Sequence, residues 1–286
     1  MEPKPARRRV AHRSRTVRGM STPEQTRVAL VTKGHPFDGP SFFEVFEANE
    51  NIEWTHVEHP EALGLVEPDR ACEFDVFVMY DMPGISFTGA DPPVEFTEPP
   101  AGYPEKFRAL LEAGKGMVFL HHAIAGWPAW PEYGDIVGGR FLYQSATVHG
   151  VEFPDSGYRH DVTHTVDVLD ASHPICTGID PSFEITDELY LAHVFEDDVH
   201  PLMRSSYDFV DTNFYSADRA IRGTRNDRTG WNHPPGSSLV AWTKTVGRSP
   251  IAYLQFGDGP QTYADPTYRR ILANAIDWAA GHSAQI

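Results

Sequence analysis

The stretch KGMVFLHHAIAGWPAWPEYGDIVGGRF, residues 115–141, contains a strand that ends at two histidines and passes into a helix. All four residues of MVFL (117–120) are apolar, which is typical of a strand covered on both faces. Similar apolar runs occur at 27–31 and 75–81, and segments with helical spacing separate the runs. This alternation predicts an α/β protein with a mostly parallel central sheet and helices on both of its faces.

Three segments predict helices. In SFFEVFEAN (41–49) the apolar residues recur at helical spacing, and a capping box begins at Ser41. The segment PEKFRALLEAG (104–114) has a proline near its start and a glycine at its end. Residues 265–281 carry one apolar stripe between an aspartate suited to the N-cap and a closing glycine, which predicts the last helix.

After Gly139 the pattern changes to alternation by twos, which predicts half-exposed strands. Residues 239–257 predict two strands joined by a tight turn. Residues 217–238 are polar and without periodicity, so we expect a long loop there, of the kind that often covers or lines a binding site. We therefore expect added β segments in the C-terminal half of a single domain that spans residues 25–282.

The charge of the chain is unevenly distributed. The formal net charge is −16, although residues 1–20 hold seven basic residues and one acidic residue. The remaining 17 basic and 39 acidic residues argue against nucleic acid or an anionic membrane surface as a partner. No apolar run approaches the ~18 residues of a membrane helix. We expect residues 1–24 to be a disordered basic tail.

The cysteine content and the glycine pattern exclude two common kinds of site. Cys72 and Cys176 form no CxxC pair, which predicts a reducing, cytoplasmic location and no zinc–thiolate site. The GGR sequence at Gly138 follows a helix rather than a strand, so it is not a dinucleotide fingerprint. We expect no cofactor, and in particular no nicotinamide dinucleotide.

Three separated blocks of the sequence share features with one known family. They are GKGMVFLHHAIAGWPAWPEYGDIVGGRF (114–141), DASHPICTGIDPSFEITDELY (170–190) and VAWTKTVGRSPIAYLQFGDGPQTYADPTYRRILANAIDWAAG (240–281). Together they resemble the ThuA-like (trehalose utilisation) family. The resemblance implies a class I glutamine amidotransferase-like, flavodoxin-related three-layer fold and a role in the catabolism of disaccharides and keto sugars. The chain departs from the family pattern at Asp258, often a histidine there, and at His122, where a serine-like residue is usual.

Polar residues follow several predicted parallel strands at the point where each strand ends. They are His35, Asp81, His121 with His122, and Asp258. Because ligands of open parallel sheets bind beyond the carboxyl ends of the strands, we expect these side chains to converge there.

The turn after the strand at 117–120 carries a nucleophilic cysteine in glutamine amidotransferases, and the matching stretch here is FLHHA. Neither cysteine of this chain lies at that turn, so we expect no glutamine amidotransferase activity. Histidine suits acid/base chemistry because its pKa is near neutrality, and we assign that role to His121. His122 points to the other side of the strand and is the better candidate for a structural role, although it could contact substrate.

Further roles are assigned to residues near this predicted edge. His35 and Asp187 are proposed catalytic groups, although a buried Asp187 could instead accept backbone N–H groups. Trp127 and Trp130 could form a wall for sugar rings or pack in the core. The proposed substrate-binding residues are Asp81, His122, Trp127, Trp130, Glu188, Tyr190 and Asp258.

Metal binding is the main alternative to metal-free chemistry. His160 and His164 have the spacing of a helical metal pair, but their surroundings predict loop and strand rather than helix. A divalent cation held by His35, His121 and a carboxylate such as Asp258 stays open.

These observations predict a protein that acts on a small-molecule carbohydrate, such as a disaccharide-derived keto sugar, by histidine-assisted acid/base chemistry. A non-catalytic sugar-binding or interaction module and a metal-dependent hydrolase are the alternatives. A homo-oligomer is compatible with each of them.

Overall fold

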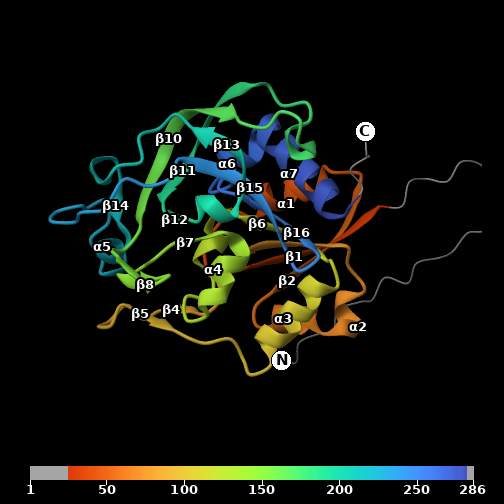
Figure 1. The fold of residues 1–286 in the computed structure, drawn as a ribbon, viewed down its shortest axis with the longest axis horizontal. Helices are drawn as coiled ribbons and strands as arrows, with labels where there is room; N and C mark the ends of the chain where they lie inside the picture. The colour runs from red at the N-terminus through yellow and green to blue at the C-terminus, as the bar shows by residue number, and fades with distance from the viewer. Residues whose placement is uncertain (1–24, 282–286) are drawn as a thin grey trace, which may run out of the picture.

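The computed structural model describes residues 25–281, so the tail predicted at 1–24 lies outside the described residues. A ten-stranded sheet runs through this part of the chain in the order β11-β10-β13-β15-β16-β6-β3-β1-β2, with β14 paired to β10 (Figure 1). Five neighbouring strands are parallel, as the apolar runs predict. These are β1 (Thr26–Lys33), β2 (Ile52–Glu58), β3 (Val76–Asp81), β6 (Gly116–Leu120) and β16 (Ser249–Leu254).

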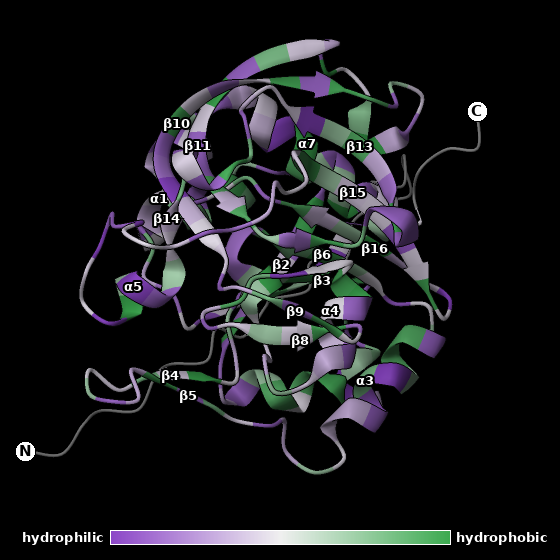
Figure 2. Ribbon diagram, turned by 60° about the vertical axis from the view of Figure 1, so that its left-hand side comes forward, coloured by the Kyte–Doolittle hydropathy of each residue, from purple (hydrophilic) through white to green (hydrophobic). Residues whose placement is uncertain are grey.

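The added strands of the C-terminal half extend this same sheet by antiparallel pairing. The predicted hairpin at 239–257 connects the antiparallel strands to the parallel ones, because the second strand of the hairpin pairs with β6. Figure 2 shows β10 and β11 as a long curved pair at one end of the sheet. The added strands are β10 (Gly157–Val168), β11 (Ser182–Leu191), β13 (His200–Ser205), β14 (Tyr215–Ser216) and β15 (Leu239–Val246).

Helices cover both faces of the sheet and produce two cores. Leu30 of β1 packs in a cluster with Phe42 and Ile271, whereas Phe119 of β6 belongs to a second cluster with Phe107 and Ile136. Alternate residues of each strand therefore enter different cores, which explains why the parallel strands are apolar throughout. Helices α1 (Gly39–Glu47), α6 (Pro260–Ala264) and α7 (Pro266–Ala279) lie on one side, and α2 (Pro68–Ala71), α3 (Tyr103–Glu112) and α4 (Pro131–Val137) on the other.

The predicted N-cap residue is confirmed for α7 and wrong for α1. Asp265 caps α7 as predicted, accepting hydrogen bonds from two backbone N–H groups of the first turn. Helix α1 begins earlier than predicted, because Asp38 rather than Ser41 is its N-cap. The Asp38 carboxylate accepts the backbone N–H of Ser41, so Asp38 has the capping role that the predicted box had given to Ser41.

The segment predicted as a long polar loop, 217–238, begins with α5 (Ala217–Ile221) and then packs against the body. The backbone N–H of Asn226 donates to the Tyr158 hydroxyl at 2.8 Å, and the Trp231 indole donates to the Asp155 carbonyl at 3.2 Å. In both ribbon views α5 lies at the same end of the molecule as the hairpin β4–β5, Ile85–Phe87 with Val94–Phe96 (Figure 2).

The remaining elements are short. Two further strand pairs are β7 (Gly139–Arg140) with β12 (His193–Val194), and β8 (Ala146–Val148) with β9 (Val151–Phe153). The 3-10 helices are η1 (Glu61–Val66), η2 (His121–Ala125), η3 (Pro174–Cys176), η4 (Glu196–Asp198) and η5 (Asp211–Asn213). No helix within the described residues is long and apolar enough to cross a membrane.

His164, on β10, makes the fold sensitive to acid. Its ring is buried, with Nδ1 2.8 Å from the Ser205 hydroxyl, and burial lowers the pKa of His164 from 6.5 to about 4. The folded protein therefore resists protonation that the unfolded chain accepts, so stability is full above pH 6.5 and falls as the pH drops toward 4.

We expect wild-type protein to lose about 2 kcal/mol of unfolding free energy between pH 7.5 and 5 through this histidine. Urea unfolding of His164→Leu at both pH values should show a loss smaller by that amount. An equal loss in wild type and variant would rule out His164 as the cause.

Candidate active site

The β6–η2 junction sets the position of the first site residue. β6 ends at Leu120, and His121 adopts φ 46° as the first residue of η2. This left-handed conformation is uncommon for a residue other than glycine, and it turns the chain sharply at the sheet edge. The Tyr253 hydroxyl holds the turn by donating to the His121 carbonyl at 2.9 Å. Neither cysteine lies at this turn, as the sequence indicates.

The His121 ring lies at the centre of a buried polar cluster. Its Nδ1 donates to the Gln255 carbonyl at 2.6 Å. Its Nε2 is 2.8 Å from the Tyr190 hydroxyl and 3.1 Å from Glu188 Oε2. Asp258 Oδ1 is 3.5 Å from the same nitrogen. His121 and Asp258, two of the residues predicted to converge, thus meet at the carboxyl edge of the parallel strands.

The alternation of β11 decides which of its acidic side chains enters the cluster. Glu188 and Tyr190 share a face and both reach His121. Asp187 points the other way and accepts three backbone N–H groups, from Glu188 at 2.9 Å, Gly257 at 2.7 Å and Asp258 at 3.1 Å. Asp187 therefore fixes the backbone that carries Asp258, which corrects its assignment as a catalytic group.

His160 joins this cluster, although the sequence pattern assigns it no site role. This residue lies on β10 next to a β-bulge between Arg159 and Val162, at a place predicted to be loop. Its Nδ1 donates to Glu188 Oε1 at 3.0 Å and lies 3.9 Å from Asp258 Oδ2. The pairing of β10 with β11 produces this contact. The sequence contains only a weak signal for a site role of His160, namely a histidine just before a run of alternating apolar and polar residues.

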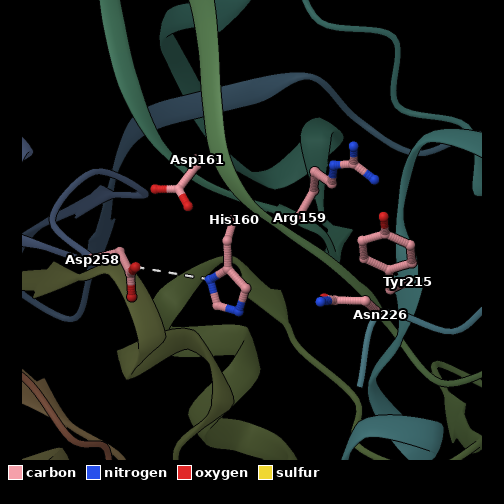
Figure 3. Close-up of a pocket in the computed structure, with 6 residues that line it drawn as sticks. All are labelled: Arg159, His160, Asp161, Tyr215, Asn226 and Asp258. Atoms are coloured by element: carbon pink, nitrogen blue, oxygen red, sulfur yellow. Dashed lines mark ion pairs between the residues drawn. The ribbon is translucent and has the colours of Figure 1, made fainter. Parts of the chain in front are cut away.

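A pocket of about 430 Å³ opens over the cluster. In Figure 3, Asp258 and Asp161 lie on one side of His160, and Arg159, Tyr215 and Asn226 lie on the other. The His160 side chain is 48% exposed and that of Asp258 22%, whereas those of His121 and Glu188 are 0% and 3% exposed. His160 is therefore the histidine that faces the pocket, and His121 lies beneath it.

The cluster has strong internal electrostatics. Burial opposes the charged form of His121, but hydrogen bonds to Asp258 and Glu188 raise its pKa well above the ordinary value. The hydrogen bond to Glu188 likewise raises the pKa of His160. Burial would raise the pKa of Glu188, but its bonds to both histidines lower it, so Glu188 is the ionised centre of the group.

The other histidines at the strand ends form a separate pair. The rings of His35 and His122 stack with centroids 4.6 Å apart, and His122 Nε2 donates to the Tyr80 carbonyl at 3.2 Å. Burial, together with the nearby His121, lowers the pKa of both rings, which keeps them neutral. The contacts of His122 are those of a structural residue. His35 borders a second hollow of about 420 Å³, and its catalytic role stays a prediction.

Three predicted contact residues lie away from the pocket. Asp81 is buried and accepts a hydrogen bond from His59 at 2.7 Å. Trp127 and Trp130 are buried against Tyr103 in the core on the α3 side of the sheet. The predicted wall for sugar rings is therefore wrong for these two tryptophans. Both indole rings pack between helix α3 and the sheet, which is the core role that the sequence left open for them.

A group of residues that could hold a metal ion occurs among the described residues, and it differs from the predicted one. The donor atoms of His121, Glu188 and Asp258 lie within 4.8 Å of one another. Glu188 thus takes the place that the sequence had given to His35. His160 and His164 do not form a helical pair, because both lie on β10.

The comparisons with known proteins agree with this architecture. The ThuA family model, described as trehalose utilisation, matches residues 73–279. A ThuA-like protein from Parabacteroides merdae ATCC 43184 superimposes with a TM-score of 0.63 at 14% identity, covering 92% of each chain. A ThuA-like protein from Bacteroides uniformis ATCC 8492 gives 0.59 at 15% identity, covering 91% of this chain and 94% of that one.

A third structure, described as a cytoplasmic protein from Salmonella typhimurium, gives a TM-score of 0.54 at 10% identity and covers 88% of this chain and 98% of its own. At such identities these structures show a shared fold only. No curated protein gives a significant sequence match. The family model spans most of the chain, including the β6 turn, β11 and the strand before Asp258. The chain therefore belongs to the ThuA family, whose description points to a carbohydrate-related role.

Proposed function

We propose that this chain is an enzyme that transfers protons at a carbon next to the carbonyl group of a keto sugar derived from a disaccharide. One observation carries the proposal. His160, Glu188 and His121 form a hydrogen-bonded chain that runs from the pocket into the protein, with Asp258 beside it. The description of the family supports a carbohydrate as substrate.

His160 is the acid/base group in this proposal. Its Nδ1 is committed to Glu188, and in Figure 3 its other ring nitrogen points away from Asp258 into the pocket. The Glu188 carboxylate orients the His160 ring, and the buried His121 ring contacts the other oxygen of Glu188 at 3.1 Å. The buried His121 is therefore a positioning residue, and the acid/base role that the sequence suggested for it passes to His160.

The other side of the pocket suits the remainder of a sugar. The Arg159 and Arg228 guanidinium groups lie 4.7 Å and 5.3 Å from the centre of the Tyr215 ring, so this ring supports the arginines rather than offering a free aromatic face to a sugar. The Asn226 amide and the Arg159 guanidinium offer hydrogen bonds to hydroxyl groups. A proton taken from the carbon beside the carbonyl gives an enediolate. Reprotonation of the enediolate on the former carbonyl carbon isomerises the sugar. Alternatively, the enediolate expels the glycosidic oxygen of the next carbon as an alkoxide, which receives the proton that His160 removed, and an unsaturated ketone remains.

The proposal is tested by NMR of trehalose, related disaccharides and their 3-keto forms, incubated with catalytic amounts of protein. His160→Gln should reduce the rate by about 10²-fold, the lower end of acid/base contributions, because water can reach this half-exposed position. His200→Ala, which changes a surface histidine paired with Asp170, should retain wild-type turnover.

Binding without turnover is the expected outcome for a sugar-binding module. A sugar that raises the melting temperature of the wild type, but is never converted, would contradict the proposed activity and favour that module.

A further inference from the structure

The His121 ring presents a fixed proton on one nitrogen. A carbonyl oxygen can only accept a hydrogen bond, so the contact with Gln255 places a hydrogen on Nδ1. In the neutral ring, Nε2 then carries a lone pair. That lone pair faces carboxylate oxygens of Glu188 at 3.1 Å and Asp258 at 3.5 Å. The Tyr190 hydroxyl also lies 2.8 Å from Nε2 and can supply one hydrogen, but the two carboxylates beside this nitrogen leave an excess of negative charge, which a proton on Nε2 or a metal cation would balance.

The spacing of these donors suits a cation. Ligands bonded to one metal ion at about 2.0–2.2 Å stand roughly 3.0–3.5 Å apart in tetrahedral or octahedral geometry. The separations of 3.1 Å and 3.5 Å at His121 Nε2 fall within that range. A proton shared between Nε2 and Glu188 explains the contact of 3.1 Å. It does not explain why the Asp258 carboxylate lies on the same side of the nitrogen.

Each of the three groups is also held by a hydrogen bond with a further residue, as metal ligands usually are. The Gln255 carbonyl fixes the tautomer and orientation of His121. The second oxygen of Glu188 accepts the hydrogen bond from His160. The backbone N–H of Asp258 donates to the buried Asp187 carboxylate, which holds this turn in place. A second layer of this kind fixes the donors before any ion arrives.

We propose that His121 Nε2, Glu188 and Asp258 bind one divalent cation at the floor of the pocket. One imidazole and two carboxylates, without a thiolate, favour an ion such as Zn²⁺ or Mn²⁺. The Tyr190 hydroxyl, 2.8 Å from Nε2, turns toward Glu188, to which it is also hydrogen-bonded. The inference rests on the proposed function for its role: the cation polarises the sugar carbonyl while His160 takes the neighbouring proton.

Cation binding is measured without any substrate. The full chain is treated with chelator, dialysed and titrated with Co²⁺, Zn²⁺ or Mn²⁺ in a calorimeter, and the visible absorption of Co²⁺ reports the ligand geometry. We expect one ion per chain, and a loss of affinity of at least about tenfold in Asp258→Ala and in Glu188→Gln. His200→Ala is the matched control and should bind like wild type. Circular dichroism checks that each variant is folded.

Two results overturn the cation site: no stoichiometric binding by the wild type, or binding that persists unchanged in both ligand variants. Turnover separates this inference from the proposed function. Chelated protein that still converts sugar, and binds no ion, would reject the cation and keep the acid/base activity. Stoichiometric binding without conversion of any sugar would keep the cation and reject the activity.

Discussion

Glu188→Gln should reduce sugar turnover by about 10³-fold or more while leaving the protein folded. The glutamine keeps the shape of the side chain but removes the charge between His121 and His160. It also places an NH₂ group against the His160 Nδ1 that now donates to the carboxylate. The acid/base histidine then loses its orienting partner, and acid/base groups typically contribute about 10²–10⁴ in rate.

Initial rates from the NMR assay would measure this effect in matched variants. Glu184 lies on the same face of β11, four residues earlier, and is exposed. Glu184→Gln should therefore turn over substrate at the wild-type rate. A Glu188→Gln rate within tenfold of the wild type, from folded protein, would remove the histidine–carboxylate chain from the mechanism.

Asp187→Ala should lower the free energy of unfolding by about 3–5 kcal/mol, because it leaves three backbone N–H groups without their acceptor in a buried place. Burial raises the pKa of Asp187 to about 6, against the hydrogen bonds and the His121 charge that lower it. The carboxylate is therefore costly to bury, and the backbone N–H groups that it accepts offset this cost and fix the turn at Asp258.

Urea unfolding at pH 7.5, monitored by tryptophan fluorescence, would measure this change. Asp167→Ala, at an exposed position on β10, should change the stability by less than about 0.5 kcal/mol. Asp187→Asn keeps one oxygen acceptor and should fall between wild type and Asp187→Ala. Loss of activity in Asp187→Ala without loss of stability would restore the direct catalytic role that the sequence suggested.

The parallel half of the sheet was predictable because its signals are local. Apolar runs such as 27–31 specify strands buried on both faces, and the capping residue Asp265 marks the start of α7. The site residues at strand ends, such as His121 and Asp258, follow from topology alone. Strand alternation predicts that Asp187 and Glu188 face opposite sides of β11, but not which of them faces the site, and the catalytic assignment went to Asp187 rather than Glu188.

The remaining features depend on contacts between distant segments. The position of His160 requires the pairing of β10 with β11 and the bulge after Arg159, neither of which the sequence pattern specifies. The burial of Trp127 and Trp130 depends on Tyr103, supplied by a helix that precedes them. A sequence pattern shows that an aromatic residue is present, but not which surface of the fold it covers.

The antiparallel and the parallel half of the sheet supply different parts of the pocket. Arg159, His160 and Asp161 come from β10 and Tyr215 from β14, whereas among the residues that line the pocket only Asp258 follows a parallel strand. The parallel half supports His121 and the Asp258 turn, and the antiparallel extension forms the surface that a ligand meets first. Substitutions at the exposed pocket positions of the extension can therefore exchange one ligand for another without touching its buried residues, such as His164 and Asp187, or the helix-covered parallel strands.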